Sequence, residues 1–304
     1  MRFEVVKAIY QAGLEDKRVC FVSGDYGHAN TEEFKRDFPG RYFNAGMSEQ
    51  NIIGIAAGLA LSGMKVFVYS IVPFITLRCL EQIKIDVCHH NVDVTIIGGG
   101  GGFAYANAGV THYAIEDVAA LRALPNMKII SPSNPTEARL LMQALIKVGG
   151  PAYVRIGRGK EPDFELEYAP EIGKAGIVRS GDDITLIASG AIITEAIRVR
   201  DMLAEQGISV EVANMHTIKP LDGDFIRARA GIRKAIFTLE EHNILGGLGG
   251  AVAEELAELP QRPLFKRFGV PDMWPDVVGS QQYLRDAVGI GARDVAEKIR
   301  DFLR

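Results

Sequence analysis

Short runs of β-branched residues alternate with helix-period segments along almost the whole chain. In the first half, strands are expected at 19–23, 65–70, 92–97, 127–130 and 152–156, and helices at 3–13, 50–61, 76–89, 115–123 and 136–148. This alternation is typical of parallel α/β layers. Several of the strands end in Gly, Ser, Pro or Asp, and ligands of open α/β sheets bind beyond the carboxyl ends of strands. The pattern therefore predicts an α/β fold with its site in those turns.

The alternation is interrupted by residues 157–183, GRGKEPDFELEYAPEIGKAGIVRSGDD, which are rich in Gly, Pro and charge. It then resumes with strands expected at 184–188, 209–213, 235–239 and 264–268, and helices at 191–206, 221–230, 249–259, 281–288 and 292–303. We therefore expect two open, mostly parallel-sheet α/β domains, at 1–160 and 184–304. Residues 161–183 would link them and could hold a short extended segment.

The composition is that of a globular protein. The 304 residues are 47% hydrophobic and 24% charged, with a formal net charge of −4. These values indicate neither a nucleic-acid nor a membrane surface. The cysteines, Cys20, Cys79 and Cys88, form no CxxC pair, and the N-terminus is too charged for a secretory signal. The expected location is the cytoplasm.

Residues 41–63, RYFNAGMSEQNIIGIAAGLALSG, contain an almost uncharged helix with a single acid at its start. Glu49 follows a Gly-Met-Ser turn, and a carboxyl group at this place is a candidate acid/base group. The alternative is that Glu49 only caps the first turn and complements the helix dipole. Gly54 and Gly58 lie four residues apart on one face, where small residues allow another backbone to approach closely.

Among the six histidines, His112 is the candidate for chemistry. It lies in GVTHYAIED, in the loop region before a helix, where an imidazole could transfer a proton or polarise a substrate. The alternative is a hydrogen-bonded turn residue. No histidine pair has the HExxH form and no cysteine lies at ligand spacing, so no metal site built by this chain is expected.

Three further motifs have two interpretations each. Arg155 and Arg158 follow a strand and could hold a phosphate or carboxylate, or could pair with acids of the linker. The glycines at 98–102 could cradle a phosphate, but they meet neither the dinucleotide nor the P-loop fingerprint, so close approach of a bulky ligand or backbone is their expected role. The Gly-rich turn in LEEHNILGGLGGAVAEEL could bind an anion or serve tight packing.

Taken together, these motifs resemble the C-terminal half of transketolases, particularly split transketolases encoded as two chains. Deoxyxylulose-phosphate synthases and the β subunits of pyruvate-type dehydrogenases are more distant relatives. The motifs that carry the resemblance, in matching order over nearly the full chain, are SGD (23–25), AGMSEQNIIGIAAGLAL (45–61), GVTHYAIEDVAALRALPNMKIISPSNPTEA (109–138), PAYVRIGRGK (151–160) and LEEHNILGGLGGAVAEEL (239–256).

The resemblance implies a thiamine diphosphate site. A glutamate in the position of Glu49 hydrogen-bonds a pyrimidine ring nitrogen in such proteins and helps to activate the cofactor, which favours the catalytic interpretation of this residue. His112 would lie near the reacting carbon and the pyrimidine amino group. Phe74 would stack on the pyrimidine ring, Met47 would support the bent cofactor, and Asp25 would approach it near a dimer interface.

The substrate side departs from fused transketolases. The resemblance implies that Arg158 holds a sugar phosphate, with Arg2 as a second phosphate arginine. Two aromatic positions of the family are Ile71 and Leu77 here, and a substrate-binding histidine is replaced by the glycine run. The expected activity is transfer of a two-carbon ketol unit between sugars or sugar-like molecules with an unusual donor or acceptor.

The family's diphosphate-binding domain, with its Gly-Asp-Gly motif and magnesium-binding Asn, is not found in this sequence. Split relatives carry it on a separate chain, so the resemblance implies an α2β2 assembly with Mg²⁺ held mainly by the partner. This chain would also self-associate. Two alternatives remain: a subunit of a decarboxylating α-keto acid enzyme and a non-catalytic scaffold.

Overall fold

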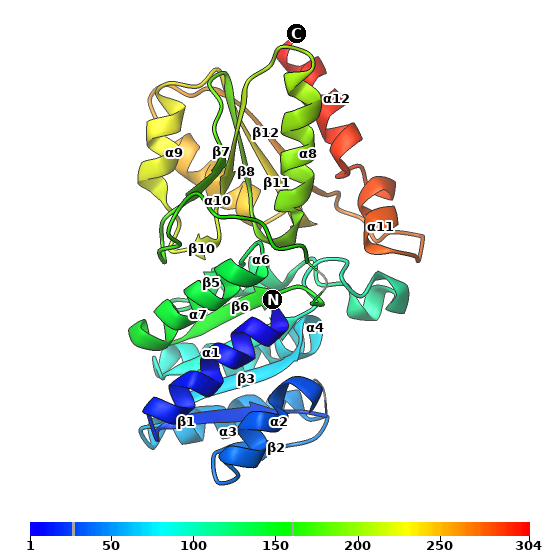
Figure 1. The fold of residues 1–304 in the computed structure, drawn as a ribbon. Helices are drawn as coiled ribbons and strands as arrows, with labels where there is room; N and C mark the ends of the chain where they lie inside the picture. Colours follow the sequence, from blue (N-terminus) through cyan, green and yellow to red (C-terminus); the bar gives the residue numbers. More distant parts are fainter. Residues whose placement is uncertain (26–27, 160) are drawn as a thin grey trace.

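The computed structural model describes residues 1–25, 28–159 and 161–304, which form two α/β units stacked end to end (Figure 1). This arrangement confirms the expected fold class. Within the described residues no helix is both long and apolar enough to cross a bilayer.

The first unit contains a seven-stranded sheet with the order β10-β5-β6-β4-β3-β1-β2. The strands are β1 (Val19–Ser23), β2 (Tyr42–Asn44), β3 (Lys65–Ile71), β4 (Val94–Gly99), β5 (Lys128–Ile130), β6 (Ala152–Ile156) and β10 (Thr217–Lys219). All pairs are parallel except β10 with β5. The helices are α1 (Arg2–Glu15), α2 (His28–Asp37), α3 (Glu49–Leu61), α4 (Val72–Ile75), α5 (Leu80–Gln82), α6 (Asp117–Arg122) and α7 (Pro135–Val148). Apolar residues of α1 and α7 pack on one face of the sheet, and those of α3, α4 and α6 on the other.

The second unit contains a five-stranded sheet with the order β12-β11-β8-β9-β7. Its strands are β7 (Gly176–Arg179), β8 (Ile184–Ala188), β9 (Val210–Asn214), β11 (Ala235–Asn243) and β12 (Leu264–Val270). Only β7 runs antiparallel to its neighbour, and it lies within the segment expected to link the domains. The helices are α8 (Ile193–Ala204), α9 (Gly223–Ala230), α10 (Leu248–Ala257), α11 (Gln281–Ala287) and α12 (Ala292–Leu303).

The helix expected at 76–89 is wrong as a continuous element. The chain forms α4, the 3₁₀ turn η1 (Leu77–Cys79), α5 and the wide π-helical segment η2 (Ile83–His89). Pro73 lies in the first turn of α4, and the hydroxyl of Thr76 donates to the carbonyl of Val72. Helix α4 therefore ends at Ile75, and a new helical turn begins at Leu77. This break determines where Phe74 and Arg78 point.

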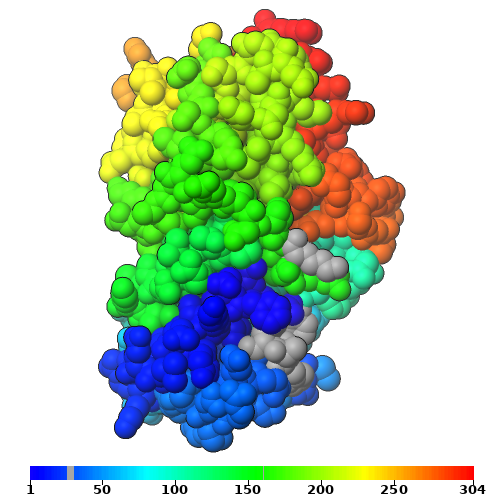
Figure 2. Space-filling view, in the orientation of Figure 1, coloured from blue at the N-terminus to red at the C-terminus, as the bar shows by residue number. Residues whose placement is uncertain are grey.

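The two units share apolar cores as well as a sheet. Strand β10 comes from the second half of the chain and completes the edge of the first sheet. The main core of the second unit also contains side chains from the first half of the chain, namely Phe103, Ala106, Tyr113 and Ile115. Figure 2 shows the same contact on the surface, where the teal segment around residues 100–110 lies against the orange segment of α11.

Candidate functional site

Glu49 lies at the start of α3, directly after the turn that follows β2. Gly46 takes a φ of +69°, which a residue without Cβ adopts at little cost, and Ser48 donates from its hydroxyl to the carbonyl of Ala45. The carboxylate is only 7% exposed, and its Oε2 lies 2.8 Å from Nη1 of Arg78. The structure thus places a buried acid at the carboxyl edge of the first sheet, with a cation facing it.

Arg78 is a candidate site residue that was not predicted from the sequence. Its guanidinium lies 4.6 Å from the ring centroid of Phe74, four residues earlier, and its carbonyl accepts a hydrogen bond from Gln50. The side chain is 50% exposed. No local motif marks it, because its proximity to Glu49 arises from the broken helix after β3. One face of Phe74 is therefore covered by a cation that also holds Glu49.

His112 also adjoins Phe74. Its ring is edge-on to Phe74 at a centroid distance of 5.2 Å and to Tyr105 at 6.2 Å. The hydroxyl of Thr111 lies 2.9 Å from Nδ1 and can set the tautomer. Glu49, Arg78, Phe74, His112 and Tyr105 therefore form a continuous row of contacts, which we call the site row; the structure thus brings the two candidate catalytic residues to one edge.

The two candidate phosphate arginines meet at Tyr105. Arg2 donates from Nη2 to the tyrosine hydroxyl at 2.9 Å, and the guanidinium of Arg158 lies 5.0 Å from the tyrosine ring centroid. Arg158 also contacts Oδ1 of Asn107 at 3.5 Å. Two guanidinium groups on one tyrosine give this end of the site row a positive character, which suits an anionic group.

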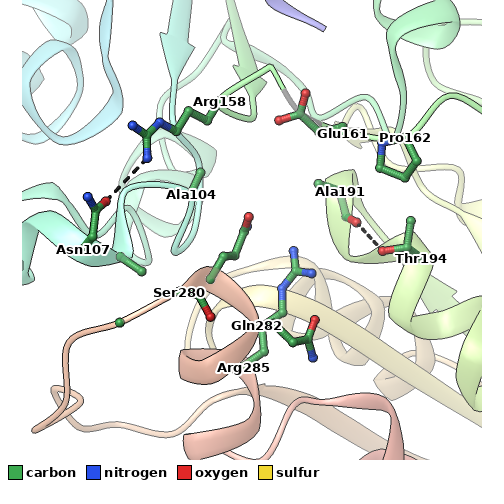
Figure 3. A pocket seen from close by; sticks show the side chains of 13 residues that line it. Ala104, Asn107, Arg158, Glu161, Pro162, Ala191, Thr194, Ser280, Gln282 and Arg285 are labelled. Carbon is green, nitrogen blue, oxygen red and sulfur yellow. Dashed lines mark hydrogen bonds between the residues drawn. The ribbon is translucent and has the colours of Figure 1, made fainter.

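A cavity of about 450 Å³ opens beside Arg158, between the two units. Figure 3 shows Arg158 reaching toward Asn107 on one side of this cavity and Arg285 from α11 on the other. Arg155, by contrast, is buried and pairs with Asp117 at 2.8 Å. Of the two interpretations of Arg155, the structure shows the salt bridge. Its partner is Asp117, however, and not an acid of the linker.

Asp25 and Met47 lie at the same edge but outside the site row. Asn44 donates to the carboxylate of Asp25 at 2.9 Å and accepts the backbone N–H of Gly46, so Asp25 is tied to the turn before Glu49. Met47 is 84% exposed, which leaves its side chain free to meet a ligand or another chain.

The glycine run serves the protein's own packing. A Cβ at Gly98 would lie 2.9 Å from both Tyr153 and Val72, and one at Gly101 would lie 2.9 Å from the guanidinium of Arg155. The sequence predicted the close approach of a ligand or a backbone, whereas at Gly98 and Gly101 it is buried side chains that approach, because they fill the space that a Cβ would need. No group of three or more potential metal ligands occurs among the residues that the structure describes.

Comparison with known proteins identifies the family. Residues 1–162 match the family of the transketolase pyrimidine-binding domain, and residues 173–295 match that of the transketolase C-terminal domain. The chain belongs to the transketolase family. It corresponds to the subunit that carries these two domains in split transketolases.

Three relatives have nearly the same extent. The chain is 38% identical to a subunit of the apulose-4-phosphate transketolase of Phocaeicola vulgatus, over 87% of this chain and 85% of that protein. It is 36% identical to a putative transketolase C-terminal section of Methanocaldococcus jannaschii, over 100% and 96%. A solved structure described as a split gene transketolase, inactive beta4 tetramer, superposes with a TM-score of 0.90 at 32% identity, over 99% of this chain and 97% of that one.

The residues of the site row fit the aminopyrimidine half of thiamine diphosphate, the cofactor of this family. Glu49 offers a carboxylate to a ring nitrogen, Phe74 an aromatic face, and His112 an imidazole, all in one contiguous set. Among the residues that the structure describes, no cluster of potential metal ligands accompanies this set, so the chain shows no comparable site for the cofactor's metal.

Proposed function

We propose that this chain is the pyrimidine-binding subunit of a thiamine-diphosphate-dependent transketolase that moves a two-carbon ketol unit between sugars or sugar-like molecules. The observation that carries the proposal is the contact sequence Glu49–Arg78–Phe74–His112, which places an acid, an aromatic ring and an imidazole on one edge of a transketolase-family chain.

In this proposal Glu49, Phe74, Met47 and Asp25 serve the cofactor. When bound, thiamine diphosphate supplies a nucleophilic carbon and an electron sink for cleavage next to a carbonyl. Glu49 holds a proton at a ring nitrogen, and its burial excludes water from that hydrogen bond. Phe74 stacks on the pyrimidine, Met47 supports the bent cofactor, and Asp25 holds the turn before Glu49 through Asn44.

His112, Arg158 and Arg2 serve the substrate. The imidazole moves a proton at the substrate oxygen next to the reacting carbon, while the two arginines hold an anionic group at the Tyr105 end of the site row. The name of the Phocaeicola vulgatus relative specifies a sugar phosphate, which supports a phosphorylated substrate.

The active enzyme is an α2β2 assembly in which a second chain holds the diphosphate and Mg²⁺. The Phocaeicola vulgatus relative, which is named as one subunit of its enzyme, and the neighbour described as an inactive beta4 tetramer support this arrangement. Gly54 and Gly58 lie exposed on α3, and a Cβ added at either position would meet no atom within 4 Å, so this helix face is open to another chain. The three buried free cysteines suit the reducing cytoplasm.

The test is calorimetry with thiamine diphosphate and Mg²⁺, on this chain alone and after mixing with a candidate partner chain that carries a diphosphate-binding domain. Binding is expected only in the mixture. Tight binding by the lone chain would contradict the shared site. Product analysis then compares ketose phosphates with pyruvate as donors, and release of carbon dioxide from pyruvate would favour a decarboxylating enzyme. A mixture that binds the cofactor but turns over no donor would identify a scaffold.

A further inference from the structure

The segment that carries His112 belongs, by its packing, to the second unit. Residues 103–113, which we call the His112 loop, leave the first sheet after β4 and contain η3 (Ala106–Ala108) and η4 (Val110–His112). Phe103 and Tyr113, at the two ends of the loop, are buried in the core of the second unit. The hydroxyl of Tyr113 also donates to the carbonyl of Val277 at 3.1 Å.

The two ends of the loop are pinned to each other. Gly102 and Ala114 form an antiparallel bridge, with both N–H···O distances at 3.0 Å. Buried Arg155 donates from the same Nη2 to the carbonyls of Ala114 and Glu241, at 2.7 and 3.0 Å. The arginine thus ties one end of the loop to strand β11 of the second unit.

Glu241 holds the other end. Its carboxylate is 4% exposed and its Oε1 accepts the backbone N–H of Phe103 at 2.7 Å. Gln281 and Arg285 of α11 donate to the same carboxylate, at 2.9 Å from Gln281 Nε2 to Oε1 and 2.9 Å from Arg285 Nε to Oε2. Gly102 has a φ of +65°, and a Cβ there would lie 2.7 Å from the carboxyl carbon of Glu241. The absence of a side chain at this position is what allows the backbone to approach the carboxylate so closely.

We propose that Glu241 is a positioning residue: with Arg285 and Gln281 it clamps the start of the His112 loop and so holds the imidazole against Phe74. The effect on catalysis rests on the proposed function, whereas the effect on the position of the His112 loop does not. This assigns a role to the C-terminal domain beyond association between chains. It also accounts for the second glutamate of the LEEH segment, whose carboxylate accepts a backbone N–H from the other unit.

The test variant is Glu241→Gln in the full chain, read by hydrogen exchange of amides in the His112 loop. A glutamine has one acceptor oxygen, so its NH₂ group must face a donor from either Phe103 or Arg285. Exchange in the loop should rise by about tenfold or more, as expected for loss of a hydrogen bond to a charged group. Gly102→Ala perturbs the same contact from the other side and should raise exchange in the same amides.

The matched control is Glu211→Gln. Glu211 is a buried glutamate of the same domain, and among the described residues its carboxylate bonds to Thr185, Arg229 and Arg233, none of which lies in the His112 loop. It should leave exchange in the loop unchanged. Unchanged exchange in Glu241→Gln, or an equal rise in Glu211→Gln, would overturn the clamp.

The kinetic arm uses the complex with the partner chain. Glu241→Gln should lower kcat with little change in KM, because the group that it positions acts on the reacting atoms. The double variant Glu241→Gln/His112→Ala should lose no more turnover than His112→Ala alone, since both act through one imidazole. Faster loop exchange in Glu241→Gln together with unchanged turnover in His112→Ala would support the clamp. The same result would remove His112 from the proposed function.

Discussion

Two buried glutamates, each facing an arginine, differ in the number of hydrogen-bond donors that surround them. Glu49 at the first sheet has one arginine partner, Arg78, whose side chain is half exposed. Glu241 at the second sheet receives donors from Phe103, Gln281 and Arg285, and all of these lie at the domain boundary. A carboxylate with spare acceptor sites can take up a ligand, whereas a saturated one is part of the framework.

The largest expected difference is in stability. Glu241→Ala leaves Arg285 buried with Glu195 at 4.0 Å as its remaining acid, and the free energy of unfolding should fall by about 3–5 kcal/mol. Glu49→Ala should cost about 1 kcal/mol or less, because Arg78 can return to solvent. Urea unfolding gives the free energy of unfolding of both variants. Equal decreases would contradict the expected difference between the two glutamates.

His242, next to Glu241, should make the domain boundary sensitive to acid. Burial lowers its pKa to about 4, and its Nε2 accepts the N–H of Ala119 while Nδ1 lies 2.7 Å from the carbonyl of Asn243. Because the unfolded pKa is near 6.5, this contribution is fully present above about pH 6.5 and is lost as the pH falls through 4, up to about 3 kcal/mol.

The measurement compares the free energy of unfolding of the native protein with that of His242→Gln between pH 4 and 7.5. Burial raises the pKa of Glu240 to about 7, so that acid contributes the opposite slope, with stability lost as the pH rises from 4.5 through 7. The same comparison in a Glu240→Gln background isolates His242, because Oε2 of Glu240 lies 3.8 Å from Nδ1 of His242 and the two groups can couple. A difference independent of pH would rule out its titration.

Glu49→Gln should show the reverse of the Glu241 behaviour, with a large loss of function at nearly native stability. Turnover of the assembled enzyme should fall by more than ~10²-fold, because the amide cannot exchange a proton with the pyrimidine. Glu81→Gln, an exposed acid in the neighbouring α5, is the control and should be inert. Near-normal turnover of Glu49→Gln would remove it from the mechanism.

The arginine partners of these two glutamates, Arg78 and Arg285, should also differ in their contribution to the free energy of unfolding. Arg78→Met removes a half-exposed guanidinium but leaves the 7%-exposed carboxylate of Glu49 without this ion pair, so it should lower the free energy of unfolding by about 1–2 kcal/mol. Arg285→Met removes a buried guanidinium from the buried carboxylate of Glu241 and should cost about 3–5 kcal/mol. Thermal unfolding of the pair checks this order. A cost for Arg78→Met as large as that for Arg285→Met would make Arg78 a framework residue.

The smallest effect concerns the open face of α3. Gly58→Ala should stabilise the dissociated chain by about 0.5–1 kcal/mol, since a Cβ there meets nothing and alanine favours the helix. Gly249→Ala, whose Cβ would lie 2.8 Å from the hydroxyl of Thr238, should destabilise it. Urea unfolding at low concentration gives the first result, and sedimentation shows whether Gly58→Ala weakens association.

The elements built from local pattern were predicted well. Strands at 19–23, 152–156 and 184–188 and the final helix at 292–303 have the predicted bounds, because each is a run of β-branched or amphipathic residues that needs only a core to pack on. Helix α2, which is strongly polar, and strand β10, which is short, were not predicted, whereas strand β7 corresponds to the short extended segment expected in the linker. The two strands pair with β5 and β9, which lie far away in the chain.

By itself the sequence determined the α/β class, the order of most elements and, through the family motifs, the choice of Glu49, Phe74 and His112. Only the tertiary structure decided which cation faces Glu49, that Tyr105 gathers Arg2 and Arg158, and that Glu241 binds the His112 loop. Propensity and periodicity act over a few residues, whereas these contacts join segments up to 138 residues apart. They form because desolvated charges and backbone N–H groups must find partners wherever the packed sheets bring them.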